Sequence, residues 1–412
     1  MTKAPMIRAH RPLIGDFSHR PALTVILESL AISAAVVATG IGIARLVIDL
    51  VRSNYANDRD FAAYWSASRQ LLHHANPYDM LAVSGLERSI GFSRGFVLVM
   101  RNPPNSLMLV LPLCSLSAKH ASLLWVFLLV VSLVVSIFLL SSIYPHRHRN
   151  VGFLGFLFAP ALCCLMTGQV GLFVLLGLVL FLRFHDSNPL TAGAALWLCA
   201  VKPHLFLPLC TVLIMWAITS KSFKLLAGAA ITIATSCIIS TSVDHSVWTQ
   251  YVKMIKSANL EQQLIPCLST VLRHAIDWRL TWLQFIPTVL GCIWAAMYFL
   301  RTDRWSWIEH GPVLILVSVL VAPYSWFPDQ AILLPAIFQV LHKRPTHAVV
   351  AALAMLCAVF ETAILIGVRL DNFTLFPWTA GVWLVWYLCA SYSFEFLLLL
   401  LLLIVSRLAL GR

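Results

Sequence analysis

The stretch ALTVILESLAISAAVVATGIGIARLVIDLV, residues 22–51, decides the class of fold. An α-helix needs about 20 predominantly apolar residues to cross a bilayer, and this stretch is longer than that. It contains Glu28 and Arg45, and no small-residue cleavage site follows it, so it does not resemble a cleaved signal peptide. We therefore predict a first transmembrane helix behind a basic, cytoplasmic N-terminus of residues 1–21.

The composition of the whole chain extends this prediction. The 412 residues are 60% hydrophobic and only 11% charged, whereas soluble domains are about 45–50% apolar and about 25% charged. Apolar runs recur along the chain, and several are shorter than a full span, which indicates broken or re-entrant helices. We predict an all-α, polytopic transmembrane helix bundle of about 10–12 spans, forming a single domain over residues 22–412.

The net charge of +12 does not indicate a nucleic-acid partner, because the basic residues stand in short clusters between apolar runs. The positive-inside rule places the pairs Lys221/Lys224, Arg301/Arg304 and Lys343/Arg344 in the cytoplasm. The loops near 52–102 and 242–281 then lie on the outer face of a cell membrane. The basic cluster 146–149 conflicts with this orientation, unless residues 103–116 are re-entrant or the cluster lies outside.

The ten cysteines are scattered, mostly within apolar segments. They form no CxxC pair and no Cys/His spacing typical of a metal site. We interpret them as small apolar packing residues and expect no metal and no cofactor.

The first outer loop contains NDRDFAAYWSASRQLLHHANPYD, residues 57–79. Its apolar spacing from Asp60 to His74 predicts an amphipathic helix at the membrane surface, ended by the Asn76–Asp79 turn. Asp58 and Asp60 stand at the outer end of the first span, where a carboxylate can take the proton of an acceptor hydroxyl. The alternative role for Asp60 is the N-cap of the helix that follows.

Four further polar spots interrupt apolar sequence, where polar groups are costly and usually have a reason. Each has an alternative, purely structural role: an interfacial cation for Arg101, a helix-breaking turn around Gln169, an interfacial lysine for Lys202, and an N-cap for Asp329. The predicted orientation places all of them on the outer face with Asp60. A transport pathway would more naturally place polar groups at the midplane.

Five segments, in this order, resemble glycosyltransferase family 87: DFAAYWSASRQLLHHANPYD, NPPNSLMLVLPL, GQVGLFVLLGLVL, AVKPHLFLPL and APYSWFPDQAILLPA. They extend over roughly residues 55–340. The family comprises polytopic enzymes of the GT-C type. The chain resembles its polyprenyl-phosphate-mannose-dependent α-mannosyltransferases.

The resemblance implies that an acid at the outer end of the first span is the catalytic base. Asp60 matches that position best, with Asp58 the near alternative. The family's lysine–proline motif matches Lys202, and Asp329 stands where some members also have aspartate. The histidine pair that often follows the Ser-Trp of the last motif is absent here, which puts a histidine partner for the base in doubt.

The function expected from the resemblance is transfer of a hexose, mannose first, from a polyprenyl-phosphate sugar to a hydroxyl on a lipid or glycan acceptor, with inversion. The alternative is a transporter or flippase for a lipid-linked substrate, which would use midplane groups such as Glu361 and tolerate change at Asp60. The expected site comprises the acids Asp60, Asp58 and Asp329, with substrate contacts from Lys202, Arg101, Gln169, Tyr64, His204, Tyr324 and Trp326.

Overall fold

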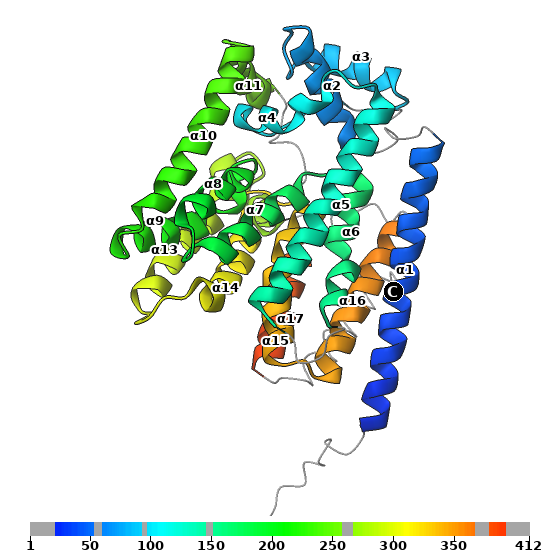
Figure 1. Cartoon of the computed structure of the whole chain (residues 1–412), viewed down its shortest axis with the longest axis vertical. Helices are drawn as coiled ribbons and strands as arrows, with labels where there is room; N and C mark the ends of the chain where they lie inside the picture. The colour runs from blue at the N-terminus through cyan, green and yellow to red at the C-terminus, as the bar shows by residue number, and fades with distance from the viewer. Residues whose placement is uncertain are drawn as a thin grey trace, which may run out of the picture.

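The computed structural model describes residues 21–52, 60–92, 97–145, 151–257, 267–366 and 379–392. Throughout these residues the regular elements are all helices, which confirms the all-α prediction. The longer helices run side by side, with α2 (Phe61–Leu72), α3 (Met80–Ser89) and α11 (Val247–Ser257) gathered at one end of the bundle (Figure 1). We call this the α2 end and the opposite one the α15 end, after α15 (Leu334–Lys343).

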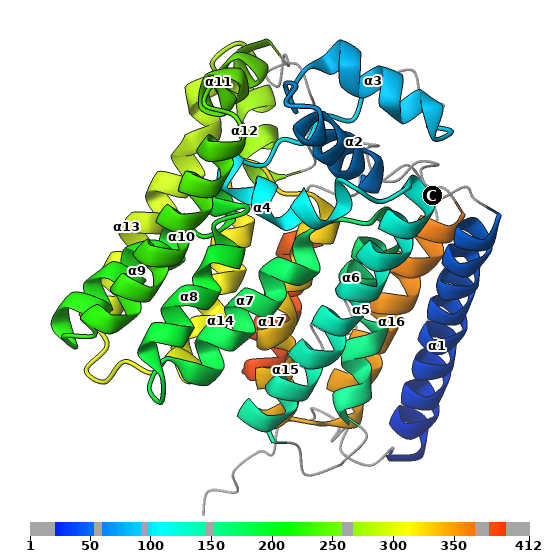
Figure 2. The same ribbon diagram turned by 45° about the horizontal axis from the view of Figure 1, so that its top comes forward.

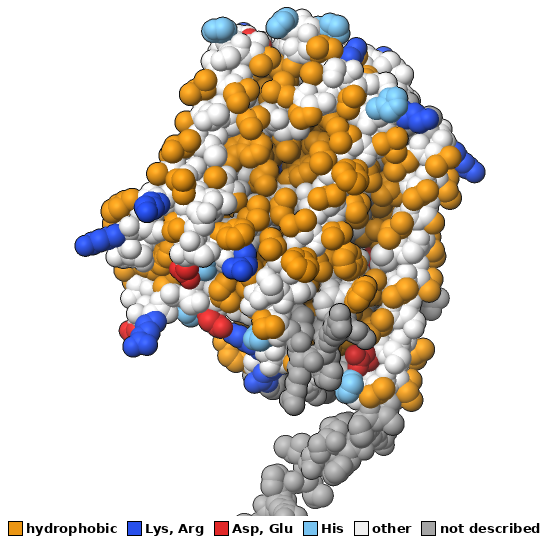
Figure 3. Space-filling model, in the orientation of Figure 1, with side chains coloured by type: hydrophobic (Ala, Val, Ile, Leu, Met, Phe, Trp, Pro, Cys, Tyr) orange, Lys and Arg blue, Asp and Glu red, His pale blue; other side chains and the backbone are white. Residues whose placement is uncertain are grey.

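Five helices are long and apolar enough to cross a membrane, counted over the described residues. They are α1 (Pro21–Val51), α5 (Ala118–Ile143), α10 (Phe223–Val243), α13 (Ile286–Leu300) with the preceding η7 (Thr281–Phe285), and α16 (His347–Leu365). Apolar side chains cover the middle of the molecule, and many of the Lys and Arg side chains in view lie toward its edges (Figure 3). This distribution is what a protein needs when its flanks face lipid.

Shorter apolar helices fill the space between the long ones. They are α7 (Gly171–Phe184), α8 (Pro189–Cys199), α9 (Leu207–Thr219), α14 (Trp307–Leu320) and α17 (Thr379–Ser391). A helix of 14 residues, such as α7, is about 21 Å long, whereas the apolar core of a bilayer is about 30 Å thick. The predicted count of ten to twelve spans therefore depends on these short helices and stays a prediction.

The turns between short helices carry the polar spots of the sequence. Gly168 ends α6 (Ala159–Thr167) with a φ of 73°, a left-handed conformation that glycine adopts without strain. The next residue is Gln169, and α7 begins two residues later. Lys202 precedes the short η5 (Pro203–Leu205) between α8 and α9.

The second predicted helix is confirmed as α2, but it does not lie open on a surface. Nine of its twelve residues are buried, and it contacts α3, α5 and the segment from η2 (Pro104–Ser106) and α4 (Leu107–Val110) to η3 (Leu111–Leu113). Figure 2 shows α2, α3 and α4 lying across the α2 end of the bundle. The expectation of a lipid-facing helix is corrected here, because protein covers the apolar face of α2.

The end of α5 bears on the conflict around residues 103–116. Beyond its last turn, the hydroxyl of Tyr144 donates to the carbonyl of Ile308 at 2.8 Å, and the carbonyl of Pro145 lies 2.6 Å from Nδ1 of His342 in α15. The chain after α5 is therefore at the α15 end, beside the predicted cytoplasmic Lys343. The preceding helical segment, Pro104–Leu113, is too short to cross. The re-entrant alternative agrees with this position and stays a prediction, and residues 146–150 lie outside the described part.

One buried and one exposed polar contact join α1 to α16. The hydroxyl of Thr39 lies 2.9 and 3.0 Å from the two carboxyl oxygens of Glu361, and Nδ1 of His347 contacts the carboxylate of Glu28 near the start of both helices. Figures 1 and 2 both show α1 at the side of the molecule next to α16. Glu361 thus has a structural partner.

Candidate functional site

Four residues from distant parts of the chain form one hydrogen-bonded row, which we call the polar row. Asp60 Oδ2 accepts from Gln169 Nε2 at 2.5 Å, and Gln169 Oε1 accepts from Lys202 Nζ at 3.0 Å. Lys202 Nζ also donates to Asp329 Oδ1 at 2.5 Å. Each member belongs to a different polar spot of the sequence, so the fold brings four of the five spots into direct contact.

Gln169 is the centre of this row, and its amide can have only one orientation. A carboxylate only accepts hydrogen bonds and an ammonium only donates them, so Nε2 must face Asp60 and Oε1 must face Lys202. The hydroxyl of Tyr64 donates to the same Oε1 at 3.2 Å. Burial, with Asp60 and Asp329 nearby, raises the pKa of Tyr64 well above its ordinary value, so this hydroxyl keeps its proton.

Asp60 occupies the N-cap position of α2, yet its side chain makes no capping hydrogen bond. Its Oδ2 is instead held by Gln169 from across the bundle. The N-cap alternative accounts for its place in the chain but not for the direction of its carboxylate. Asp60 is only partly buried, as a group must be if it is to meet a substrate.

Lys202 and Asp329 form a buried ion pair. Their side chains are 9% and 1% exposed, and the second oxygen of Asp329 accepts from the backbone N–H of Trp326 at 2.9 Å. Asp329 therefore also supports the start of η8 (Phe327–Leu333), but as its third residue, since the N-cap is Trp326 and not Asp329 as the alternative role required. Because the ammonium of Lys202 is paired with this carboxylate, it is a poor candidate for the main phosphate ligand.

Arg101 lies close enough to Asp60 and Tyr324 to interact with both electrostatically. Burial lowers the pKa of its guanidinium, and these two neighbours counteract the shift; an arginine remains charged under such a shift. In the described part of the chain no hydrogen bond or ion pair joins its guanidinium to another side chain. It is the cation of the site that is best able to meet an anion.

The segment after Arg101 is anchored to the C-terminal end of α8, next to Lys202. Asn102 Nδ2 donates to the carbonyl of Val201 at 3.0 Å, and Asn105 Nδ2 donates to the carbonyl of Ala200 at 3.2 Å. The hydroxyl of Tyr78 donates to the carbonyl of Asn102 at 3.1 Å. These contacts fix Arg101 relative to Lys202 although 101 positions separate them in the chain.

His204 and Tyr324 bring the two late motifs together. Their rings stack with centroids 3.8 Å apart at 25°. Burial lowers the pKa of His204, so its imidazole is neutral. Trp326 contributes its backbone N–H to Asp329 rather than its ring to the polar row.

One supporting residue, Trp125, could not be selected from the sequence. Its indole N–H donates to the carbonyl of Gly168 at 2.7 Å, and its ring lies 5.2 Å from that of Tyr64. It therefore supports both neighbours of Gln169. A tryptophan inside an apolar run is normally interpreted as a packing residue, and only the fold shows its contacts with Gly168 and Tyr64.

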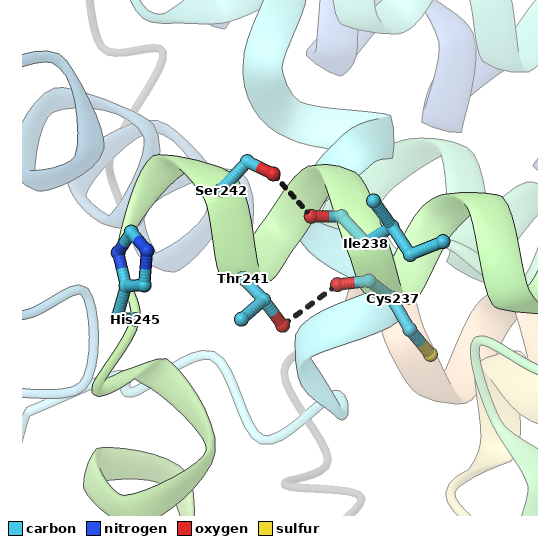
Figure 4. Close-up of a pocket in the computed structure, with 5 residues that line it drawn as sticks. All are labelled: Cys237, Ile238, Thr241, Ser242 and His245. Carbon is cyan, nitrogen blue, oxygen red and sulfur yellow. Dashed lines mark hydrogen bonds between the residues drawn. The ribbon is translucent and has the colours of Figure 1, made fainter.

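Two other expectations remain without a test. Asp58 lies outside the described residues. Within the described residues no group of three His, Cys, Asp or Glu side chains could hold a metal ion, so the expectation of no metal stays a prediction. The hollow in Figure 4 is not a site, because its lining comes from α10 and from His245, two residues beyond it, and the hydroxyls of Thr241 and Ser242 donate to carbonyls of α10.

Comparison with known proteins identifies a family. The model of glycosyltransferase family 87 matches residues 101–323, more than half of the chain. No curated protein and no solved structure matches. The matched region contains Arg101, Gln169 and Lys202, and hydrogen bonds from Gln169 and Lys202 tie Asp60 and Asp329 to it.

Proposed function

The chain belongs to glycosyltransferase family 87, and on that premise we propose that it transfers a hexose, mannose first, from a polyprenyl-phosphate sugar to a membrane-presented hydroxyl. The acceptor is a lipid or a lipid-linked glycan. The donor's apolar tail would lie among the helices, and its phosphate and sugar would lie at the polar row. The proposed location is the outer face of a cell membrane, with the N-terminus in the cytoplasm.

One observation carries this proposal: the carboxylate of Asp60 is held by Gln169, which is itself held by Lys202 and Tyr64. A general base must be fixed in direction and still reach its substrate. Asp60 meets both conditions, since one oxygen is anchored and the side chain is only partly buried.

The proposed reaction is a single displacement. The acceptor oxygen attacks the anomeric carbon, its proton passes to Asp60, and the bond from that carbon to the phosphate oxygen breaks. The polyprenyl phosphate leaves with the electron pair of that bond, and the anomeric configuration inverts. Since the leaving group is a stable phosphate anion, this chemistry does not require a metal.

Arg101 is the proposed partner of the departing phosphate. Its guanidinium can donate two parallel hydrogen bonds to phosphate oxygens, and such fixed charge is most effective where water is excluded. Lys202 has a different proposed role from the one expected at first. It holds Gln169 and Asp329 in place and adds positive potential near the phosphate without being its main ligand.

The transporter alternative predicts a function for midplane groups such as Glu361 and tolerance at Asp60. Glu361 is fully buried against Thr39 between α1 and α16, which gives it a structural role. Hence no observation favours it over the transferase.

The decisive experiment compares wild-type protein with Asp60→Asn in liposomes, using a panel of polyprenyl-phosphate sugars and a membrane lipid extract as acceptor. The asparagine oxygen can still accept from Gln169 Nε2, so the fold and donor binding should be preserved. We expect the release of polyprenyl phosphate to fall by about 10²–10⁴-fold, the usual contribution of a general base.

The matched control is Asp79→Asn, because Asp79 is an aspartate that caps α3 with two backbone hydrogen bonds and lies outside the polar row. It should retain most of the activity. Equal release by wild type and Asp60→Asn would move the base to Asp58 or Asp329. Absence of release from every donor by folded wild-type protein would refute the transferase proposal.

A further inference from the structure

The backbone of Val321–Pro323 leads directly into the loop that carries Tyr324 and Asp329. Helix α14 ends just before it, at Leu320, and the carbonyls at the end of a helix lack partners within the helix. Each buried carbonyl left without a hydrogen bond would cost about 1–3 kcal/mol. Something outside α14 must therefore satisfy this turn.

Side chains of the region Cys267–Thr288 do so. Each carbonyl has one close donor, and longer contacts run from Ser269 Oγ to Val321 at 3.4 Å and from Cys267 Sγ to Pro323 at 3.6 Å. Thr288 Oγ1 donates to Val321 at 2.6 Å, Ser269 Oγ donates to Ala322 at 2.8 Å, and Gln284 Nε2 donates to Pro323. These donors come from α13, α12 (Leu268–Ile276) and η7, respectively.

Arg273 explains why Gln284 can serve Pro323. Its guanidinium Nη1 donates to Gln284 Oε1 at 2.7 Å, which leaves Nε2 as the only amide group that can face the Pro323 carbonyl. Arg273 is only 2% exposed, and burying an arginine is costly unless the charge is used. A residue that served only to attach the loop would not require a buried charge.

We propose that Arg273 and Gln284 are positioning residues, which act through the Pro323 carbonyl to set the placement of the loop Tyr324–Asp329. The loop delivers Tyr324 against His204 and Asp329 against Lys202. A displacement of about 1 Å at a site can reduce a rate by about 100-fold. This inference rests on the proposed function for its effect on catalysis, but not for its effect on the loop.

The test uses Gln284→Glu in the full-length protein. The carboxylate keeps an acceptor for Arg273, so that contact is preserved, but it replaces the N–H group that faces Pro323 with an oxygen. We expect deuterium exchange at the backbone amides of Tyr324–Phe327 to rise at least about tenfold, because their local opening becomes easier. The matched control is Arg279→Gln, since Arg279 is an exposed arginine of the same loop, and it should leave this exchange unchanged.

The kinetic arm separates positioning from mere folding. For Gln284→Glu we expect kcat per folded molecule to fall by about ten- to a hundredfold, with the donor KM within about threefold of the wild-type value. Arg273→Lys, which keeps the charge but loses the forked donor geometry, should give a smaller fall in the same direction. A fall in activity that only follows the amount of folded protein would overturn the proposal.

Two safeguards keep the result decisive. If Gln284→Glu does not fold, Gln284→Asn removes the same contact by shortening the side chain and has the same expected outcomes. If wild-type protein transfers no sugar, the proposed function fails, while the exchange arm still decides the inference. Unchanged exchange at Tyr324–Phe327 in a folded variant would overturn it whatever the activity.

Discussion

Replacing Lys202 with methionine should destabilise this protein strongly. Its ammonium contacts Asp329 at 2.5 Å, and the two side chains are 9% and 1% exposed. Removing one member of a buried ion pair leaves an uncompensated charge and costs about 3–5 kcal/mol. Asp329 keeps one hydrogen bond, from the backbone N–H of Trp326, so we expect a value near the lower end, about 3 kcal/mol.

A double-mutant cycle measures this cost. In Lys202→Met/Asp329→Leu neither charge remains, and apolar replacements of buried pairs are often neutral. The double variant should therefore be at least about 2 kcal/mol more stable than the sum of the single effects predicts, which is within the range of coupling energies for contacting residues. Unfolding in mixed micelles, titrated with a denaturing detergent, gives the free energies.

The control is the ion pair of Lys343 with Glu309, which has the same 2.5 Å separation but side chains 48% and 52% exposed. Lys343→Met should cost less than about 1 kcal/mol, because solvent screens an exposed pair. The reasoning is refuted if Lys202→Met costs no more than this control, or if the two single effects simply add. Either result would mean that burial does not set the strength of this contact.

Three further predictions concern other parts of the molecule. Burial raises the pKa of Glu87 to about 7, so the folded protein binds this proton more tightly than the unfolded chain. The free energy of unfolding should then fall by about 3 kcal/mol as the pH rises from about 4.5 to about 7. Thermal unfolding of Glu87→Gln should not show this pH dependence. The same pH dependence in both proteins would contradict the role given to Glu87. Gly193→Ala should prevent normal packing of α8 on α10, because the added carbon would lie 1.9 Å from a backbone oxygen. The control is Gly40→Ala in α1, whose added carbon meets nothing within 4 Å. Similar yields of folded protein for the two variants would contradict this prediction. Glu361→Gln should keep glycosyl transfer within about threefold of wild type, because its buried role is to contact α1, and loss of transfer in folded protein would restore a functional role for this acid.

Much of the fold could be predicted because hydropathy acts locally. Residues 22–51 were predicted to cross the membrane, and α1 spans Pro21–Val51. The spacing from Asp60 to His74 predicted α2, which covers Phe61–Leu72. Helix α3 was missed, since its signal is a single cap at Asp79 before a short and only moderately apolar segment. The covered position of α2 was also missed, because an amphipathic pattern does not say whether lipid or protein lies on its apolar face.

The candidate site was predictable as a set of residues but not as an arrangement. Polar groups in apolar sequence are costly, so Asp60, Arg101, Gln169, Lys202 and Asp329 could all be selected from the chain alone. Their pairing could not, because Lys202 and Asp329 are 127 positions apart and Gln169 and Asp60 are 109 apart. The expectation that Lys202 meets phosphate assumed a free ammonium, and the partner that occupies it became visible only in the fold.

The sequence by itself determined that this is a helical membrane protein and which polar groups need a partner, since both follow from the cost of placing residues in or near lipid. Tertiary structure decided which partner each group has. It directed Asp60 to Gln169 instead of its own helix, paired Lys202 with Asp329, and left Arg101 as the cation of the site that can meet an anion. The physical reason is that hydrogen bonds and ion pairs depend on distances of a few ångströms between atoms, and only packing of the helices sets those distances.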